Sequence, residues 1–226
     1  MSQRTYTIFV TLVGLVCAWV VIHWFVLSPA SLTLRNALIQ GTLVGFGFAV
    51  VTVEILAKIK ATKVNGWVTV YDAGRPGNNM FTRTAHARLF PGPVNLPEEA
   101  MYWWAHTDGA GRSLTGEHHY IMHFPPGGLP PNNAFWSLTM ADTKNHFVEN
   151  PLNRYKLGQI AGEHSDLVQN PDGSLDIYIQ NTAPAGHESN WLPAPKGAFN
   201  IWLRAYIPGK TILDGKYVVP PIELKQ

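Results

Sequence analysis

"HHYIMHFPPGGLPPNNAFWSLTM", residues 118–140, contains two runs of apolar and aromatic residues on either side of a loop with four prolines and two glycines. Short apolar runs that end at proline and glycine are typical of β-strands. The loop "PPGGLPP" has neither the lysine nor the following helix of a phosphate-binding loop. We therefore interpret the stretch as two strands joined by a rigid connection, and it predicts no cofactor.

The chain continues in the same way on both sides of this stretch. Further strands are predicted at "GWVTVYD" (66–72), at "FNIWLRAYIP" (199–208) and, as a final edge strand, at "KYVVPPIEL" (216–224). "NMFTRTAHARLF" (79–90) predicts a short helix. Many short strands at this spacing favour a mainly β fold, a sandwich or a jelly roll, over alternating strands and helices. No linker divides residues 66–226, so we predict a single domain there.

Three hairpins are predicted from turn residues between neighbouring strands. "EEAMYWWAHT" (98–107) is expected to pair with "HHYIMHF" (118–124) across "DGAGRSLTGE". "NAFWSLTM" (133–140) is expected to pair with "KNHFVEN" (144–150). The strongest signal is Asn170-Pro171-Asp172-Gly173, which lies between two alternating runs in "DLVQNPDGSLDIYIQN" (166–181).

Two long apolar segments precede the β region, "TIFVTLVGLVCAWVVIHWFVL" (7–27) and "NALIQGTLVGFGFAVVTVEILAKIK" (36–60). At roughly 1.5 Å per residue, each is long enough for a hydrocarbon core of about 30 Å. The connection "SPASLTLR" is short, so we predict a transmembrane helical hairpin in residues 1–63, with helices at about 6–27 and 37–58. A signal peptide cleaved at Ser28-Pro29-Ala30 is the alternative.

Basic residues surround the open end of this hairpin. Lys58 and Lys60 lie at the end of the second segment and Lys63 follows it, whereas Arg35 is the one charged residue of the connection. The hairpin makes this a multi-pass membrane protein, and the positive-inside rule predicts that its β domain is cytoplasmic.

The second segment also contains Gly41 and Gly45, four residues apart, which is a spacing that lets another helix approach closely. Gly14 and Ala18 of the first segment are one expected partner surface. A helix of another protein or of a second copy is the other. The bilayer and such a helix are the partners that the sequence predicts.

Charge and cysteine content exclude several classes. The formal net charge is +2, so no nucleic acid or other strong polyanion is expected as a partner. Cys17 is the one cysteine, which excludes an intrachain disulfide and a zinc site built from several thiolates.

Histidines are the first chemical candidates. His119 and His123 lie on the same face of one predicted strand, about 13 Å apart at roughly 3.3 Å per residue, which is too far to chelate one metal ion unaided. A metal site would need His106 or His146 from a neighbouring strand. The alternative is that these histidines form hydrogen bonds at a sheet surface.

Arginines and tryptophans are the second group. Arg154 in "NRY" and Arg204 in "WLRAY" lie among aromatic residues, where each is either a structural arginine bonded to loop carbonyls or a clamp for an anion. Tryptophans such as Trp136 and Trp191 either stack on sugars or fill the core. The candidate ligand-binding residues are His123, Trp136, Arg154, Tyr155, Asn190, Trp191 and Arg204.

Five stretches also carry a family resemblance: "YIMHFPPGGLPPNNAFWSLTMAD", "NPLNRYKLG", "NPDGSLDIYIQ", "NWLPAPKGAFNIWLRAYIP" and "VVPPIEL". Together they resemble the domain of unknown function numbered 1214, the carboxy-terminal domain of bacterial and archaeal 1254/1214 proteins. The resemblance implies a jelly-roll-like β-sandwich, a prokaryotic cell membrane and, because many relatives are exported, an extracytoplasmic location for the domain. Ala141 departs from the family pattern, which usually has tyrosine there.

Three functions follow as hypotheses. The first is a membrane-anchored, non-catalytic module that binds a polar or glycan-like envelope ligand. The second is a metal-assisted or acid/base hydrolase that uses His119, His123 and an acid such as Asp142. The third is an accessory or assembly subunit whose hairpin packs on partner helices through Gly41 and Gly45.

Overall fold

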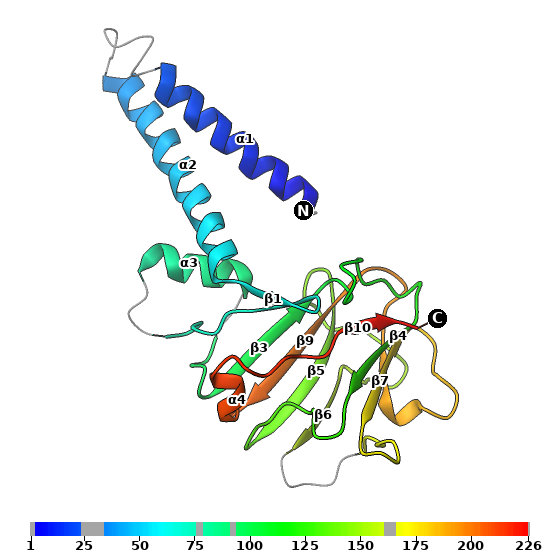
Figure 1. Ribbon diagram of the computed structural model, residues 1–226. Helices are drawn as coiled ribbons and strands as arrows, with labels where there is room; N and C mark the ends of the chain where they lie inside the picture. Colours follow the sequence, from blue (N-terminus) through cyan, green and yellow to red (C-terminus); the bar gives the residue numbers. More distant parts are fainter. Residues whose placement is uncertain (1–2, 24–33, 76–78, 91–93, 161–165, 226) are drawn as a thin grey trace. The chain divides into compact units, whose positions relative to one another are not determined.

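The structure, a computed structural model, describes residues 3–23, 34–75, 79–90, 94–160 and 166–225. The chain forms two compact units. The first contains residues 1–60 and 77–92, and the second contains residues 61–76 and 93–226. Figure 1 shows the helices of the first unit and the strands of the second.

The first unit consists of the helices α1 (Gln3–Ile22), α2 (Leu34–Lys60) and α3 (Met80–Leu89). α3 is the short helix predicted from the sequence, and its first turn is capped by Asn79, whose side chain accepts a hydrogen bond from the Thr82 backbone N–H. An ion pair of 3.1 Å between Arg88 of α3 and Glu54 of α2 links the two helices.

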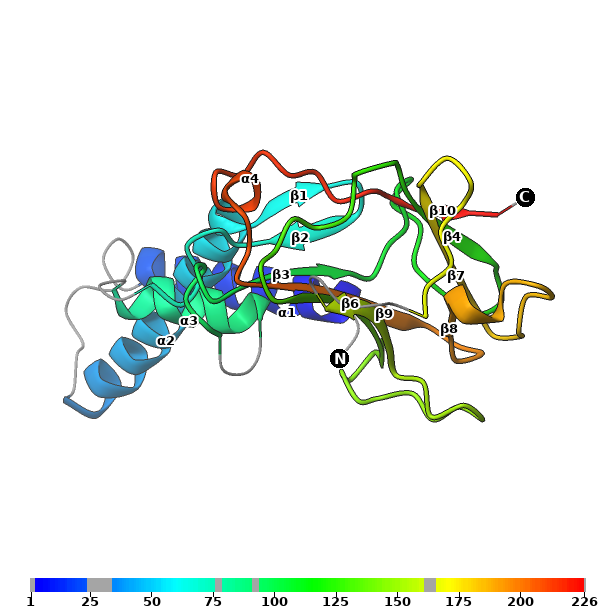
Figure 2. The same cartoon turned by 90° about the horizontal axis from the view of Figure 1, so that it is seen from below.

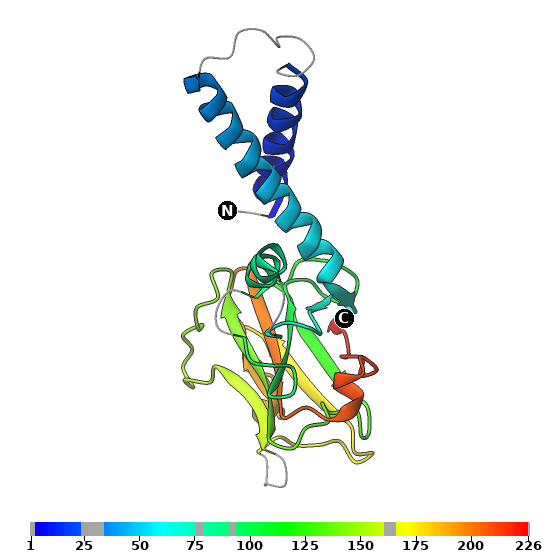
Figure 3. The ribbon, with the colours of Figure 1, turned by 90° about the vertical axis from the view of Figure 1, so that its left-hand side faces the viewer.

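α1 and α2 lie side by side (Figures 1 and 3), but not through the glycines that the sequence indicated. A Cβ atom added to Gly47 would collide with Cys17 of α1, so the contact depends on Gly47 having no side chain. At Gly41 and Gly45, an added Cβ would meet nothing within 4 Å. The predicted contact of Gly41 and Gly45 with α1 is therefore wrong, because α1 packs against a different face of α2, the one that carries Gly47.

Length and composition single out one candidate membrane span among the described residues. It is Asn36–Lys60 of α2, with a mean hydropathy of 1.8 over its most apolar window. The apolar segment of α1, Phe9–Ile22, is shorter. The described chain thus offers one candidate span where the sequence predicted two.

The second unit contains two sheets. Six strands form an antiparallel sheet in the order β1-β2-β3-β9-β5-β6. Four strands form a second sheet in the order β10-β4-β7-β8. Figure 2 shows the two sheets next to each other. The strands of the first sheet are β1 (Thr62–Val64), β2 (Trp67–Thr69), β3 (Ala100–Ala105), β9 (Phe199–Tyr206), β5 (Phe135–Asp142) and β6 (Lys156–Ile160). Those of the second are β10 (Ile222–Leu224), β4 (Tyr120–Phe124), β7 (Leu175–Gln180) and β8 (Trp191–Pro193). Two short helices complete the unit, η2 (Glu188–Asn190) and α4 (Lys210–Leu213).

One hydrophobic core joins the two sheets. Successive side chains of a strand point to opposite faces, and alternate residues of both sheets contribute to the same buried cluster. Trp103, Leu138 and Leu203 come from the first sheet and Met122 and Ile177 from the second, each at most 3% exposed. The predicted mainly β fold is confirmed as two packed sheets. β7 and β8 run parallel, a pairing that an all-antiparallel jelly roll does not contain.

The first predicted hairpin is wrong. β3 and β4 belong to different sheets, because the loop between them carries the chain from one sheet to the other. The buried Asp108 carboxylate holds this loop by accepting hydrogen bonds from the backbone N–H groups of Ala110 and Arg112 and from the Arg112 guanidinium. Asp108 and Gly109 do form a turn, but this turn belongs to a loop that connects the two sheets and not to a hairpin.

The other two hairpins are also wrong in their partners. β5 pairs with β6, and residues 144–150 contribute only a single bridge, Ala141 with Phe147. The turn at Asn170–Gly173 forms as predicted, with Gly173 N–H donating to the Asn170 carbonyl at 2.9 Å. However, residues 167–170 are not a strand, and β7 pairs with β4 instead.

Candidate functional site

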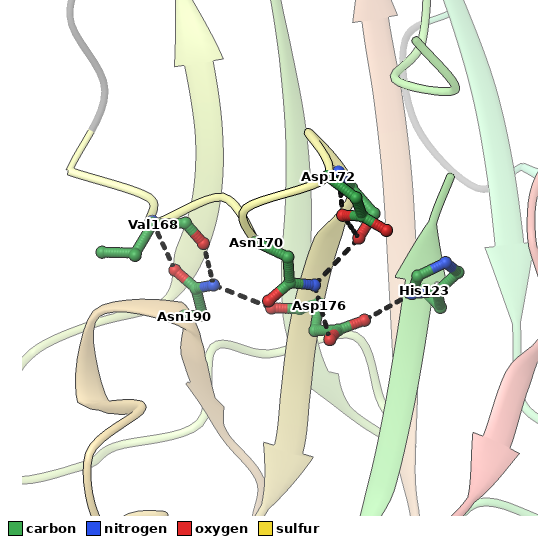
Figure 4. A network of polar contacts seen from close by, with 7 residues as sticks. His123, Val168, Asn170, Asp172, Asp176 and Asn190 are labelled. Atoms are coloured by element: carbon green, nitrogen blue, oxygen red, sulfur yellow. Dashed lines mark hydrogen bonds and ion pairs between the residues drawn. The ribbon is translucent and has the colours of Figure 1, made fainter. Parts of the chain in front are cut away.

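A polar network lies on the outer face of the four-stranded sheet (Figure 4). His123 of β4 is paired in register with Asp176 of β7, and both point away from the core because their neighbours Met122 and Ile177 point into it. His123 Nδ1 lies 2.6 Å from Asp176 Oδ1. The His123 side chain is 52% exposed, so solvent reaches the ring while its Nδ1 is held.

Asp176 is itself held from the other side. Its Oδ2 accepts a hydrogen bond of 2.9 Å from the Asn170 side chain, which also donates to Ser174 Oγ. Ser174 in turn donates to Asp172 through both its backbone N–H and its hydroxyl. These two bonds lower the pKa of Asp172, and the charge of the nearby His123 adds a smaller effect in the same direction. The turn that was visible in the sequence therefore positions the carboxylate that orients His123.

Asn190 connects this network to the neighbouring loop (Figure 4). Its side chain accepts from the Val168 N–H at 2.8 Å and donates to the carbonyls of Val168 at 2.7 Å and Asp176 at 2.9 Å. The residue is only 5% exposed. Its amide thus satisfies three backbone groups of the fold.

Arg154 is fixed in a similar way. Its Nη1 donates to the carbonyl oxygens of Glu188 and, at 3.0 Å, of Trp191. Its own backbone is held by Asn150, whose side chain accepts from the Arg154 N–H and donates to the Arg154 carbonyl, both at 3.0 Å. The contacts of a structural arginine predicted from the sequence are present.

A cavity of about 350 Å³ opens beside Arg154. It lies at the edge strand β6, next to η2 and to the residues that Asn190 holds. Apolar and polar side chains both face it. The lining residues are Phe135, Trp136, Ser137, Arg154, Lys156, Leu157, Gly158, Gln159, Ile160, Asp166, Leu167 and Ser189.

The remaining predicted ligand residues lie apart from each other. Trp136 lines the cavity from the core side and is 2% exposed, whereas Trp191 donates through its indole N–H to the Gln180 carbonyl at 2.9 Å. Tyr155 packs against Phe147 with ring centroids 5.2 Å apart.

Arg204 lies on β9, in the middle of the six-stranded sheet. Its Nη1 donates to Thr139 Oγ1 at 2.9 Å, and its guanidinium is 5.7 Å from the ring centroid of Trp202. Arg204 is not among the cavity residues. Arg154 and Arg204 therefore do not form a joint anion clamp in this cavity.

The partners expected for a metal or hydrolase site are arranged differently from the prediction. Within the described ranges, no three His, Cys, Asp or Glu side chains are grouped to hold a metal ion. His106 stacks on Trp104 at 4.6 Å, and burial lowers its pKa. Asp142, the acid proposed for His123, ends β5 in the other sheet and accepts from the Lys144 and His146 N–H groups. Asp176 occupies the position beside His123 instead.

Sequence reasoning missed the pairing of His123 with Asp176 and the cavity residues Lys156, Gln159 and Ser189. A turn signal and a strand pattern were visible around Asp176, but its partner depends on the pairing of β4 with β7, which are 53 residues apart at this point. Lys156, Gln159 and Ser189 had no motif that distinguished them.

Comparison with known proteins supports the fold. Residues 99–210 match the family model "Protein of unknown function (DUF1214)". No curated protein matches the chain. The crystal structure of the VPA0106 protein from Vibrio parahaemolyticus is similar with a TM-score of 0.60 and 23% identity, over 87% of this chain and 47% of that one. An uncharacterized protein from Burkholderia cenocepacia has a TM-score of 0.41 and 14% identity, over 98% of this chain and 49% of that one. The chain thus spans about half the length of both structures.

Proposed function

The chain belongs to the DUF1214 family through residues 99–210, and we propose that it is a membrane-anchored binding module with a jelly-roll-like sandwich, whose site is the cavity beside β6. The cavity is the observation that carries this proposal. Its volume of about 350 Å³ is within the range of small-molecule sites, which combine apolar walls with a few placed polar groups. Trp136 and Leu157 provide such a wall, and Arg154 and Gln159 provide polar groups.

A substitution that fills the cavity tests the proposal. Ser189 is exposed at the cavity wall, so we expect Ser189→Trp to leave the fold intact and to weaken ligand binding roughly tenfold or more by occupying the space. Binding is measured by ligand-observed NMR on the full chain in neutral detergent, with a panel of monosaccharides and small organic acids. Thr182→Trp, at an exposed position outside the cavity, is the matched control. Equal binding by both variants, or no binding by the unmodified chain, contradicts the proposal.

For the anchor, we propose that α2 crosses the bilayer and that α1 returns beside it as the second arm of a hairpin. An even number of crossings puts the amino terminus and the sandwich on one side of the membrane, and the lysines in the last turn of α2 favour the cytoplasm. The face of α2 with Gly41 and Gly45 then stays open for a helix of another protein or of a second copy.

The single cysteine makes the helix contacts testable. A Cβ at Gly47 would lie 3.3 Å from the Cβ of Cys17, close to the separation of about 3.8 Å in disulfides. We expect Gly47→Cys to form an intrachain disulfide with Cys17 on mild oxidation, which non-reducing gels and thiol labelling detect. Gly41→Cys is the matched control, and we expect a disulfide-linked dimer from it where two copies meet at this face. Failure of Gly47→Cys to close would contradict the hairpin, and a monomeric Gly41→Cys would contradict self-association through α2.

A second candidate function, an acid/base hydrolase, is favoured by one observation. Asp176 holds Nδ1 of the exposed His123 at 2.6 Å, which leaves the other ring nitrogen available for proton transfer.

A further inference from the structure

The charges around the cavity are not balanced. Arg154 and Lys156 line it, and Asp166 is the one acid among the lining residues that the structure describes. Throughout the described part of the chain, none of these three side chains forms an ion pair with another residue. The described residues that line the cavity therefore carry one net positive charge, which favours a ligand with a single negative charge over a neutral molecule.

The Arg154 guanidinium offers an edge for such a charge. Its two hydrogen bonds to the carbonyls of Glu188 and Trp191 both use Nη1. Among the described residues, its Nε and Nη2 groups have no protein partner. This pair of N–H groups matches the two oxygens of a carboxylate.

The Glu188 carboxylate does not neutralise this edge. Glu188 gives Arg154 only its backbone carbonyl, while its carboxylate accepts from the Gly186 N–H at 3.1 Å. The contacts at Nη1 and at the Arg154 backbone also hold the guanidinium in one position. A ligand therefore does not have to order a flexible side chain, which lowers the entropic cost of binding.

The rest of the cavity lining is largely apolar, which favours a ligand that has an apolar part as well as a negative charge. Trp136, Leu157, Ile160 and Leu167 line it, and the Lys156 ammonium lies 6.0 Å from the Phe135 ring centroid. Apolar surface of this kind is favourable for binding only when the ligand covers it. An inorganic anion would leave this apolar surface in contact with water.

We propose that the ligand of this cavity is a small monocarboxylate with an apolar body, whose carboxylate pairs with Nε and Nη2 of Arg154. The proposal rests on the proposed binding function and adds the ligand class to it. Lys156 contributes a second, more distant positive charge, and Asp166 disfavours ligands with two negative charges.

Phenylacetate and phenylacetamide test the class, because they have the same shape and differ in charge. We expect the full chain in neutral detergent to bind phenylacetate roughly tenfold to a hundredfold more tightly than phenylacetamide, as measured by ligand-observed NMR titration. Inorganic phosphate is expected to bind more weakly than phenylacetate. Arg154→Gln is expected to remove the preference for the acid, whereas Arg83→Gln, the same change at an exposed arginine of α3, retains it.

The outcomes separate the two proposals. Equal affinity for acid and amide, or phosphate binding as tight as phenylacetate, overturns the ligand class but leaves the cavity a binding site. No binding of either compound, together with no effect of Ser189→Trp on the wider panel, overturns both. If Arg154→Gln does not fold, Lys156→Gln replaces it as the test variant, and Lys196→Gln, at an exposed lysine outside the cavity, is its matched control. The first must weaken phenylacetate but not phenylacetamide, and a change in neither or in both contradicts the assignment.

Discussion

Replacing Asn190 with alanine is expected to lower the free energy of unfolding by about 2–4 kcal/mol. The amide of this buried residue serves the Val168 N–H, the Val168 carbonyl and the Asp176 carbonyl. Removal of the amide leaves all three backbone groups without their hydrogen-bond partner. Each group that water does not reach then lowers the free energy of unfolding by about 1–3 kcal/mol. The value is below the sum because the Val168 residue is 62% exposed, so water replaces part of what is lost.

The measurement is urea unfolding of the full chain in mild detergent, followed by tryptophan fluorescence. Asn181→Ala is the matched control, since that side chain makes one bond, to the Ala194 carbonyl at 2.9 Å, and we expect a loss of about 1 kcal/mol. Asn190→Asp keeps the acceptor for the Val168 N–H but turns a carboxylate towards two carbonyls, so it should be at least as damaging as alanine. A loss at Asn190 no larger than that at Asn181 would show that the amide does not hold the loop.

The same substitution is also expected to affect the cavity. Val168 follows directly on Asp166 and Leu167, which line the cavity, and Asn190 follows Ser189, which lines it too. One buried amide therefore fixes two parts of the cavity wall. Stability of the fold and shape of the site depend here on the same side chain.

Individual strands could be predicted from the sequence because their signals are local. β9 shows alternation over eight residues, and β10 begins directly after two prolines that favour a sheet edge. The capped helix α3 was equally visible, since Asn79 precedes it and "PGP" follows it. Each of these elements is decided within about ten residues of chain.

The pairing of strands could not be predicted in the same way. Asp108 and Gly109 have the composition of a hairpin turn, yet the Asp108 carboxylate binds N–H groups of its own loop and directs the chain to the other sheet. Asn170–Gly173 turns as expected, but the strand that β7 joins is β4. Turn residues specify a local reversal, and which strand lies beside the next one depends on the whole core.

In the candidate site, too, single residues could be predicted from the sequence, but their contacts with distant residues could not. Arg154 and His123 were visible as unusual residues, and the loop carbonyls that Arg154 binds were one of its two predicted environments. The Asp176 partner of His123 and the cavity depend on contacts between residues far apart in sequence. Arg154 and Arg204 look alike in the sequence, each among aromatic residues, but only Arg154 lines the cavity.

His123→Gln is the change with the largest expected effect on any hydrolytic activity. A histidine oriented by a carboxylate accepts a proton from water while the water oxygen attacks an ester carbonyl. The tetrahedral intermediate then expels the p-nitrophenolate anion, and the histidine releases the proton to solvent. General acid/base catalysis of this kind contributes about 10²–10⁴-fold. We therefore expect His123→Gln to reduce hydrolysis of p-nitrophenyl acetate by the full chain by about that factor, measured as release of p-nitrophenolate.

The neighbouring His119 makes this test specific. It lies on the same face of the chain as His123 and is also exposed, but no ion pair among the described residues joins it to a carboxylate. His119→Gln should therefore leave the rate unchanged if orientation by Asp176 is what makes His123 effective. Asp176→Asn should lower the rate because an amide no longer stabilises the charged ring that forms during proton transfer. Equal losses from the two histidines would mean that any exposed imidazole suffices, and a rate no higher than that of free imidazole would leave only the binding function.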